Sequence, residues 1–146
     1  MIHHVWTVLC SRALIDRDSN NISIHNVLEQ LNIAAPPQPD LALNIHFEIL
    51  SLWVRTHSAV PAQGTSRVTL EDPQGTRRVV SELTIDLAEV ERTRHRVLGQ
   101  GLEVSRAGRY NFLVELQETG RSEWREVAVV PLTVVFTPPE EQQGPS

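Results

Sequence analysis

The chain of 146 residues has one cysteine, no lysine and only 5% aromatic residues. The single cysteine, Cys10, excludes an internal disulfide and fits a reducing compartment. No run of about 18 apolar residues occurs, so a membrane-spanning helix is not expected. The N-terminus lacks a basic start, a long apolar stretch and a small-residue cleavage site. We therefore expect the mature start of a cytoplasmic protein.

Because lysine is absent, all 13 basic side chains are arginines, in a chain with a formal net charge of −5. The planar guanidinium group can pair with a carboxylate at two points and can stack on an aromatic ring. A net acidic domain binds nucleic acid poorly unless its arginines gather on one face. We therefore expect neither nucleic acid nor a membrane among the partners.

Convincing helical periodicity is also absent, and alternating patterns typical of β-strands take its place. Gly108 supplies a turn, because a residue without Cβ adopts positive φ cheaply. One face of the strand that follows carries Tyr110, Phe112, Val114 and Leu116. This segment predicts a strand with one side turned to a core.

Two hairpins are expected from turn chemistry. Residues 66–87 contain the turn Asp72-Pro-Gln-Gly75, with proline in its second place and glycine in its fourth. Residues 108–136 contain a second turn, at residues 119–122. Pro131 lies inside the last strand and indicates an edge or a bulge, because proline donates no backbone hydrogen bond.

Further strands are expected over residues 4–10, 22–33, 44–55 and 94–104. The alternation slips near Asn26, which predicts a bulge, and slips again after Ile49. Gly99 and Gly101 interrupt the last of these strands and indicate a bulge or the close approach of another backbone.

The remaining segments join or follow these strands. Residues 34–40 are proline-rich and predict a connector between sheets. Residues 87–96 could form one or two turns of surface helix, but we favour a loop because the apolar anchors are few. The polar tail, residues 137–146, is expected to be disordered. The pattern predicts one all-β domain over residues 1–136, a two-sheet sandwich of about eight strands.

Two resemblances refine this fold. Residues 105–112, Ser-Arg-Ala-Gly-Arg-Tyr-Asn-Phe, resemble the tyrosine-corner stretch of immunoglobulin-like domains, with Phe112 in place of the disulfide cysteine. Trp53 lies on the third strand, as a core tryptophan of those domains would. Residues 9–24, together with Asp72-Pro-Gln-Gly75 and the Gly108 strand, are similar to small bacterial proteins of unknown function. The resemblance implies an immunoglobulin-like antiparallel sandwich and transfers no catalytic residue.

The first candidate site is a calcium loop. Asp16, Asp18 and Asn20 fit the first three ligand positions, where alternate oxygens converge on a hard cation. Asn21 replaces the turn glycine, and Val27 stands where a bidentate glutamate should be. The alternative is a hairpin turn in which these side chains cap backbone groups.

The second candidate is the densest basic cluster, made of Arg92, Arg94 and Arg96 together with Arg77 and Arg78. It would bind an anion or an acidic partner. The alternative is a solvated face on which the arginines pair with Glu89, Glu91 and Glu103.

Catalytic motifs are missing. The chain has no G-x-S-x-G sequence, no phosphate-cradling glycine loop and no cysteine with a placed histidine. The six histidines show neither the helical nor the strand spacing of a zinc site. We therefore expect a non-enzyme without a cofactor.

The preferred functional hypothesis is a non-catalytic protein-interaction or scaffold module that binds an unknown protein partner and could form a homodimer. Residues 5–10 and 45–54 are apolar on both faces, which is more than one sandwich interior needs. The alternative is a small-ligand domain, for example for carbohydrate, with Trp124 and Trp53 as stacking platforms and with Trp6 and Tyr110 as further aromatic candidates.

Overall fold

The computed structural model describes residues 1–34 and 41–137, which form eleven β-strands and no helix. The strands are β1 (Ile2–Ile15), β2 (Ile22–Val27), β3 (Gln30–Ile33), β4 (Leu41–Leu43), β5 (Phe47–Arg55), β6 (Ala62–Glu71), β7 (Arg77–Leu87), β8 (Arg92–Gly99), β9 (Leu102–Val104), β10 (Gly108–Glu118) and β11 (Arg125–Phe136). Within the described residues, no helix has the length and apolar character needed to cross a membrane.

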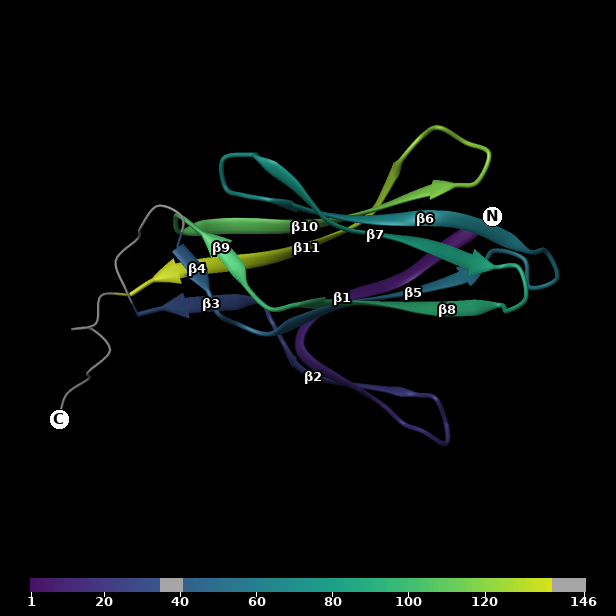
Figure 1. Ribbon diagram of the computed structural model, residues 1–146, viewed down its shortest axis with the longest axis horizontal. Coiled ribbons are helices and arrows are strands. Elements are labelled where there is room, and N and C mark those ends of the chain that lie inside the picture. Colours follow the sequence, from purple (N-terminus) through teal and green to yellow (C-terminus); the bar gives the residue numbers. More distant parts are fainter. Residues whose placement is uncertain (35–40, 138–146) are drawn as a thin grey trace.

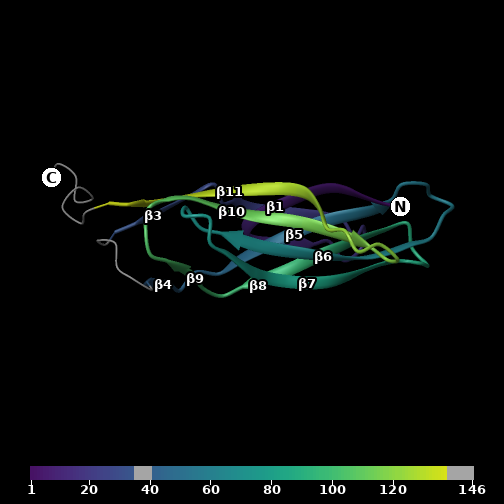
Figure 2. The same ribbon diagram turned by 90° about the horizontal axis from the view of Figure 1, so that it is seen from above.

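The strands form two main sheets that lie against each other (Figure 1 and Figure 2). Sheet A has the order β2-β1-β5-β8, and sheet B has the order β3-β11-β10-β6-β7. β4 and β9 make a separate antiparallel pair. β3 runs parallel to β11, whereas the other pairs between described strands are antiparallel. The expected all-β fold with two sheets is confirmed, with eleven strands in place of about eight.

The main core lies between the two sheets. Its largest fully buried side chains include Trp53, Tyr110 and Phe112. The hydroxyl of Tyr110 donates to the carbonyl oxygen of Arg106, four residues upstream, at 3.0 Å. This is the hydrogen bond expected of a tyrosine corner.

The alternation in β5 continues without the slip expected after Ile49. Phe47, Ile49 and Trp53 are all buried among the residues of the main core. Leu50, on the opposite face of β5, is also buried, but in a second cluster with Cys10 and other residues of β1 and β2. Both faces of β5 are apolar because both are covered.

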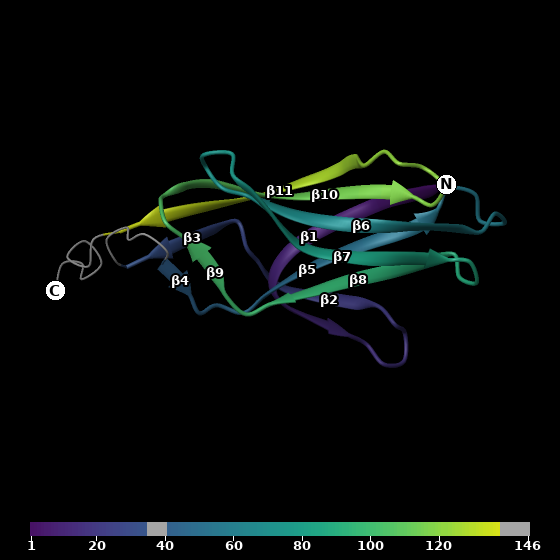
Figure 3. The ribbon, with the colours of Figure 1, turned by 45° about the horizontal axis from the view of Figure 1, so that its top comes forward.

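The outer face of β5, which points away from sheet B, is covered by another part of the same chain. β1 bends, and the hairpin of β1 and β2 folds beneath β5 and β8, as Figure 1 and Figure 3 show. Buried Cys10, Ala13 and Leu50 pack there against partly buried residues, namely Trp6, Val8, Ile22 and Ile24. Part of the apolar outer face that suggested a partner surface in the sequence is therefore covered within the chain.

The segment expected as one strand over residues 22–33 divides into β2 and β3, which belong to different sheets. Asn26 has a φ of 59°, and the Leu28 amide donates to the Leu9 carbonyl oxygen at 2.9 Å. The break in the alternating pattern near Asn26 is therefore the place where the chain leaves sheet A. The predicted bulge within one continuous strand is wrong.

Both predicted hairpins are confirmed by the pairing of β6 with β7 and of β10 with β11. In the first turn, the Gly75 amide donates to the Asp72 carbonyl oxygen at 3.0 Å, and Gly75 has a φ of 86°. Pro131 lies outside the part of β11 that pairs with β3, so only β10 flanks it. The expectation of an edge position for Pro131 is confirmed.

The segment expected as one strand over residues 94–104 is β8 and β9, with the break between Gly99 and Leu102. A Cβ atom at Gly99 would overlap the ring of Phe47. β8 starts at Arg92, so the helical alternative for residues 87–96 is wrong and the favoured loop is limited to residues 88–91. Residues 35–40 of the connector expected over 34–40, and residues 138–146 of the disordered tail expected over 137–146, lie outside the described residues.

Candidate anion-binding groove

A groove of about 580 Å³ lies between the β1–β2 hairpin and the outer face of sheet A. Its apolar lining comes from Trp6, Ile15, Ile22 and Leu52. Its cationic lining comes from Arg92, Arg94 and Arg96 of β8, and polar residues at the hairpin tip and in β8 complete it. Among the described residues, no aspartate or glutamate lines this groove.

The three arginines share one face because they alternate along a β-strand. They stand opposite Val54, Leu52 and Leu50 of β5 in the strand register. His95, which lies between Arg94 and Arg96, points to the interior, where its Nδ1 contacts Ser66 Oγ at 2.9 Å. The sequence pattern Arg-Thr-Arg-His-Arg therefore places all three guanidinium groups on the outer face of sheet A.

Arg96 is held by a buried carboxylate. Its Nε donates to Oε1 of Glu48 at 2.6 Å, and its Nη2 donates to the Ala13 carbonyl oxygen at 3.3 Å. Oε2 of Glu48 accepts from the Ala13 amide. Only 1% of the Glu48 side chain is exposed, so its charge requires a partner. Arg96 therefore neutralises Glu48 and ties the hairpin to sheet A.

Arg94 and Arg92 have no acidic partner among the described residues. Nη2 of Arg94 donates to the backbone oxygen of Asn20 at 2.8 Å and to its side-chain oxygen at 2.9 Å. Glu89 and Glu91, expected as possible partners, form no ion pair in the described part of the chain. Two uncompensated positive charges therefore face the groove.

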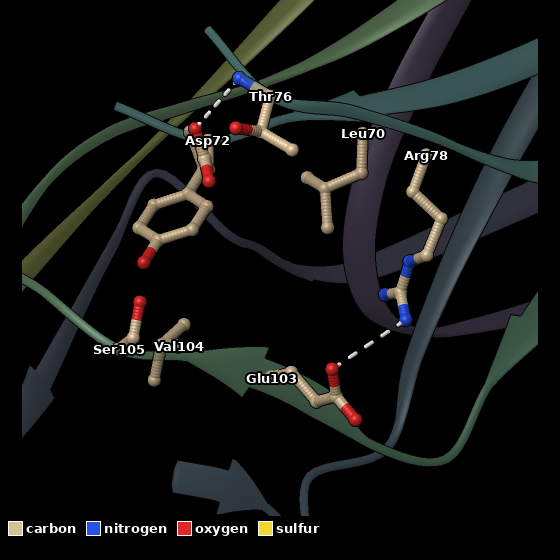
Figure 4. Close-up of a pocket in the computed structure, with 8 residues that line it drawn as sticks. Leu70, Asp72, Thr76, Arg78, Glu103, Val104 and Ser105 are labelled. Carbon is tan, nitrogen blue, oxygen red and sulfur yellow. Dashed lines mark hydrogen bonds and ion pairs between the residues drawn. The ribbon is translucent and has the colours of Figure 1, made fainter. Parts of the chain in front are cut away.

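The predicted five-arginine cluster divides into two places. Arg77 pairs with Glu71 at 2.9 Å, and Arg78 approaches Glu103 to 3.8 Å. Arg78 and Glu103 line a smaller pocket of about 190 Å³ that also includes Asp72 (Figure 4). The charges of Arg77 and Arg78 are thus matched locally, in a part of the molecule that does not line the groove.

The two tryptophans predicted to stack on a ligand differ in how far they are exposed. Trp53 is completely buried, with the rings of His4 and His95 at centroid distances of 5.1 and 6.2 Å, so a ligand cannot reach it. Trp124 is half-buried beneath Arg67, whose guanidinium carbon lies 4.0 Å from the ring centre. One face of Trp124 is therefore covered by the chain.

The hairpin tip uses the candidate calcium ligands for its own turn. Oδ1 of Asp16 accepts from the Ser19 and Asp18 amides at 2.9 Å each, and these hydrogen bonds lower the pKa of the Asp16 carboxyl. Both Asn20 oxygens accept from the Arg94 guanidinium, which is itself a cation. The described residues hold no group of three or more histidine, cysteine, aspartate or glutamate side chains suited to a metal ion.

A serine–histidine contact lies inside the sandwich. Besides its contact with Ser66, His95 contacts the Thr84 carbonyl oxygen through Nε2 at 3.0 Å, and burial lowers the pKa of its imidazole. Ser66 is only 5% exposed. These contacts join β8 of sheet A to β6 and β7 of sheet B, so the pair connects the two layers.

The apolar half of the groove was hard to foresee from the sequence. Trp6 stood among the aromatic candidates, but nothing in the sequence joined it to the arginines of β8. Ile15, Ile22 and Leu52 read as ordinary strand residues. Residues 5–10 and 45–54 are apolar on both faces, and this pattern could have pointed to them. The groove forms where the β1–β2 hairpin covers the outer face of these strands.

No family model and no curated protein matches the chain. Among solved structures, the chain is similar to part of a β-glucosidase from Listeria innocua in complex with glucose, with a TM-score of 0.48 and 11% identity over 74% of this chain and 15% of that chain. It is also similar to the N-terminal domain of PorA, with a TM-score of 0.34 and 13% identity over 90% of this chain and 98% of that chain. The chain spans 15% of the length of that β-glucosidase chain.

Proposed function

We propose that the protein is a non-catalytic binding module that captures an anionic group in the groove beneath the β1–β2 hairpin. The observation that carries this proposal is the lining: Arg92 and Arg94 have no acidic partner among the described residues, and no described acidic residue lines the groove, in a chain of net charge −5. A concave site lined by positive charge focuses a positive electrostatic potential, and this potential attracts anionic ligands even when the whole protein is acidic.

The chemistry of the two unpaired arginines supports an anion of carboxylate or phosphate type. A guanidinium group presents donors in a planar fork that matches these oxyanions at two points. Arg94 already uses Nη2 on Asn20, which fixes its orientation and leaves Nε and Nη1 as single donors on different edges of the guanidinium, so the two-point fork is that of Arg92. Such prior ordering lowers the entropy cost of binding.

The groove favours a bound ligand over a flat protein interface. Small-ligand sites are concave, of about 300–1,000 Å³, and combine apolar walls with a few converging polar groups. The hairpin covers Cys10 and Leu50 on the outer face of sheet A, which reduces the apolar area available for a flat homodimer interface. A neutral carbohydrate would leave Arg92 and Arg94 without a counter-charge, so the proposal specifies an anion.

We also propose the immunoglobulin-like class for this sandwich. Its support is the hydrogen bond from Tyr110 to the Arg106 carbonyl oxygen and the buried Trp53 on β5.

Thermal unfolding at constant ionic strength tests the proposed function. Pyrophosphate and citrate should raise the Tm of the wild-type protein, because a ligand at about 100 times its Kd adds about 2.7 kcal/mol to the free energy of unfolding. The double variant Arg92→Gln/Arg94→Gln should lose this rise. Arg121→Gln, at an exposed position in the β10–β11 turn, is the matched control and should keep it. Equal shifts in the double variant and the control would overturn the proposal.

A further inference from the structure

We propose that the groove takes a small amphipathic organic anion, with its carboxylate or phosphate head on Arg92 and Arg94 and its apolar body against Trp6, Leu52 and Ile15. This inference rests on the proposed function and specifies its ligand class. The lining of the groove is apolar on one side and cationic on the other.

The strand register orders this arrangement. Trp6 on β1 stands opposite Leu52 on β5, which stands opposite Arg94 on β8. Neighbouring strands lie about 4.8 Å apart, so the backbones of Trp6 and Arg94 are separated by roughly 10 Å. A ligand that contacts both ends of this row needs an apolar part and an anionic part about that far apart.

The hairpin supplies the opposite apolar wall. Ile15 and Ile22 face each other across the β1–β2 pair, and both line the groove. Ile15 is 48% exposed although it lines the groove together with Trp6. An apolar ligand body would bury this side chain, whereas an inorganic anion would leave it in water.

The position of the head follows from the ion pairs. Arg96 is already neutralised by Glu48, so it offers little to a second anion. Arg92 and Arg94 alternate on the same face of β8 and have no described acidic partner. The head group therefore belongs at the Arg92 end of the groove, away from the Glu48 carboxylate.

The ligand class is tested by isothermal titration at constant ionic strength with 2-naphthoate, octanoate, inorganic phosphate and neutral 2-naphthol. The organic anions should bind at least tenfold more tightly than either inorganic phosphate or 2-naphthol. Arg92→Gln/Arg94→Gln should weaken 2-naphthoate binding at least tenfold, and Arg121→Gln should leave it unchanged.

A second variant separates the two halves of the site. Ile15→Asn changes an exposed side chain, so the protein should fold, and thermal unfolding of the free variant checks this. It should weaken 2-naphthoate at least threefold and leave the affinity for inorganic phosphate unchanged.

The outcomes distinguish this inference from the proposed function. Equal affinities for phosphate and 2-naphthoate, with no effect of Ile15→Asn, would overturn the amphipathic ligand and leave the anion site standing. Binding of 2-naphthol as tight as that of 2-naphthoate would overturn both, as would no binding at all. An acidic peptide that binds more tightly than every organic anion would overturn the small-ligand class alone.

Discussion

The Arg96 guanidinium donates to the buried Glu48 carboxylate, with Nε 2.6 Å from Oε1. The same two side chains reach the Ala13 amide and carbonyl oxygen, so one ion pair connects β5, β8 and the bent part of β1. This pair therefore holds the β1–β2 hairpin, which forms one side of the groove, against the outer face of sheet A. Arg96 stabilises this arrangement and does not bind the ligand.

Loss of Arg96 should be much more damaging than loss of Arg92. Arg96→Gln leaves a buried carboxylate without its cation and should lower the free energy of unfolding by about 3 kcal/mol. Arg92→Gln, which breaks no described ion pair, should change it by less than about 0.5 kcal/mol. Urea unfolding of both variants measures the difference, and equal effects would contradict the assigned role of the pair.

The reactivity of the Cys10 thiol reports whether the β1–β2 hairpin stays packed on sheet A. Cys10 is fully buried beneath the hairpin, and burial raises the pKa of its thiol, followed by the nearby Glu48 charge. A thiol reagent should therefore react slowly with the wild-type protein and faster with Arg96→Gln under conditions where both are folded. An unchanged rate would mean that the hairpin stays closed without Arg96.

Substituting Gly99 and Gly101 by alanine compares a crowded position with an open one and so tests how β8 packs on β5. Gly99→Ala places a methyl group within the ring of Phe47 and should cost about 1–3 kcal/mol. Gly101→Ala places it 3.6 Å from the Leu43 carbonyl oxygen, an ordinary contact, and should cost little. Thermal unfolding ranks the two variants, and Gly99→Ala/Phe47→Leu should recover part of the loss. A larger loss from Gly101→Ala would contradict the packing of β8 on β5.

Acidification should destabilise the fold through His95 and His4. Burial lowers the pKa of each imidazole in the folded protein, with the His3 charge adding to the effect on His4. In the unfolded chain both titrate near the ordinary value of about 6.5. Below that pH the unfolded state binds more protons, so the free energy of unfolding falls as pH decreases from about 7 to 5.

Urea unfolding across that pH range measures the slope. His95→Gln should flatten it, because one of the two shifted groups is gone. His57→Gln, at an exposed position, should leave it unchanged. A wild-type free energy of unfolding that rises as the pH falls from 7 to 5 would contradict the lowered pKa of these partly buried histidines.

Local chemistry made much of the fold predictable. The Asp72–Gly75 turn, the Gly108 strand and the alternation of Arg92, Arg94 and Arg96 follow from rules that involve neighbours in the sequence. The same rules place Pro131 where β11 has one flanking strand.

The rest depends on contacts between distant segments. The hairpin that covers β5 is held by the Cys10–Leu50 cluster and by the Glu48–Arg96 pair, and the partners of that pair are 48 residues apart. Without that topology, Trp53 could not be assigned to the core or Trp6 to the groove. Arg77 and Arg78 could not be separated from the β8 arginines either.

If an organic anion binds beside Trp6, the indole signals of the three tryptophans should report it residue by residue. Two-dimensional ¹H–¹⁵N NMR resolves one indole peak for each, and Trp6→Phe assigns the peak of Trp6. On addition of 2-naphthoate, the Trp6 peak should shift in a saturable way, while the peaks of buried Trp53 and of Trp124 beneath Arg67 should stay in place. A saturable shift of the Trp124 peak with a static Trp6 peak would contradict the account.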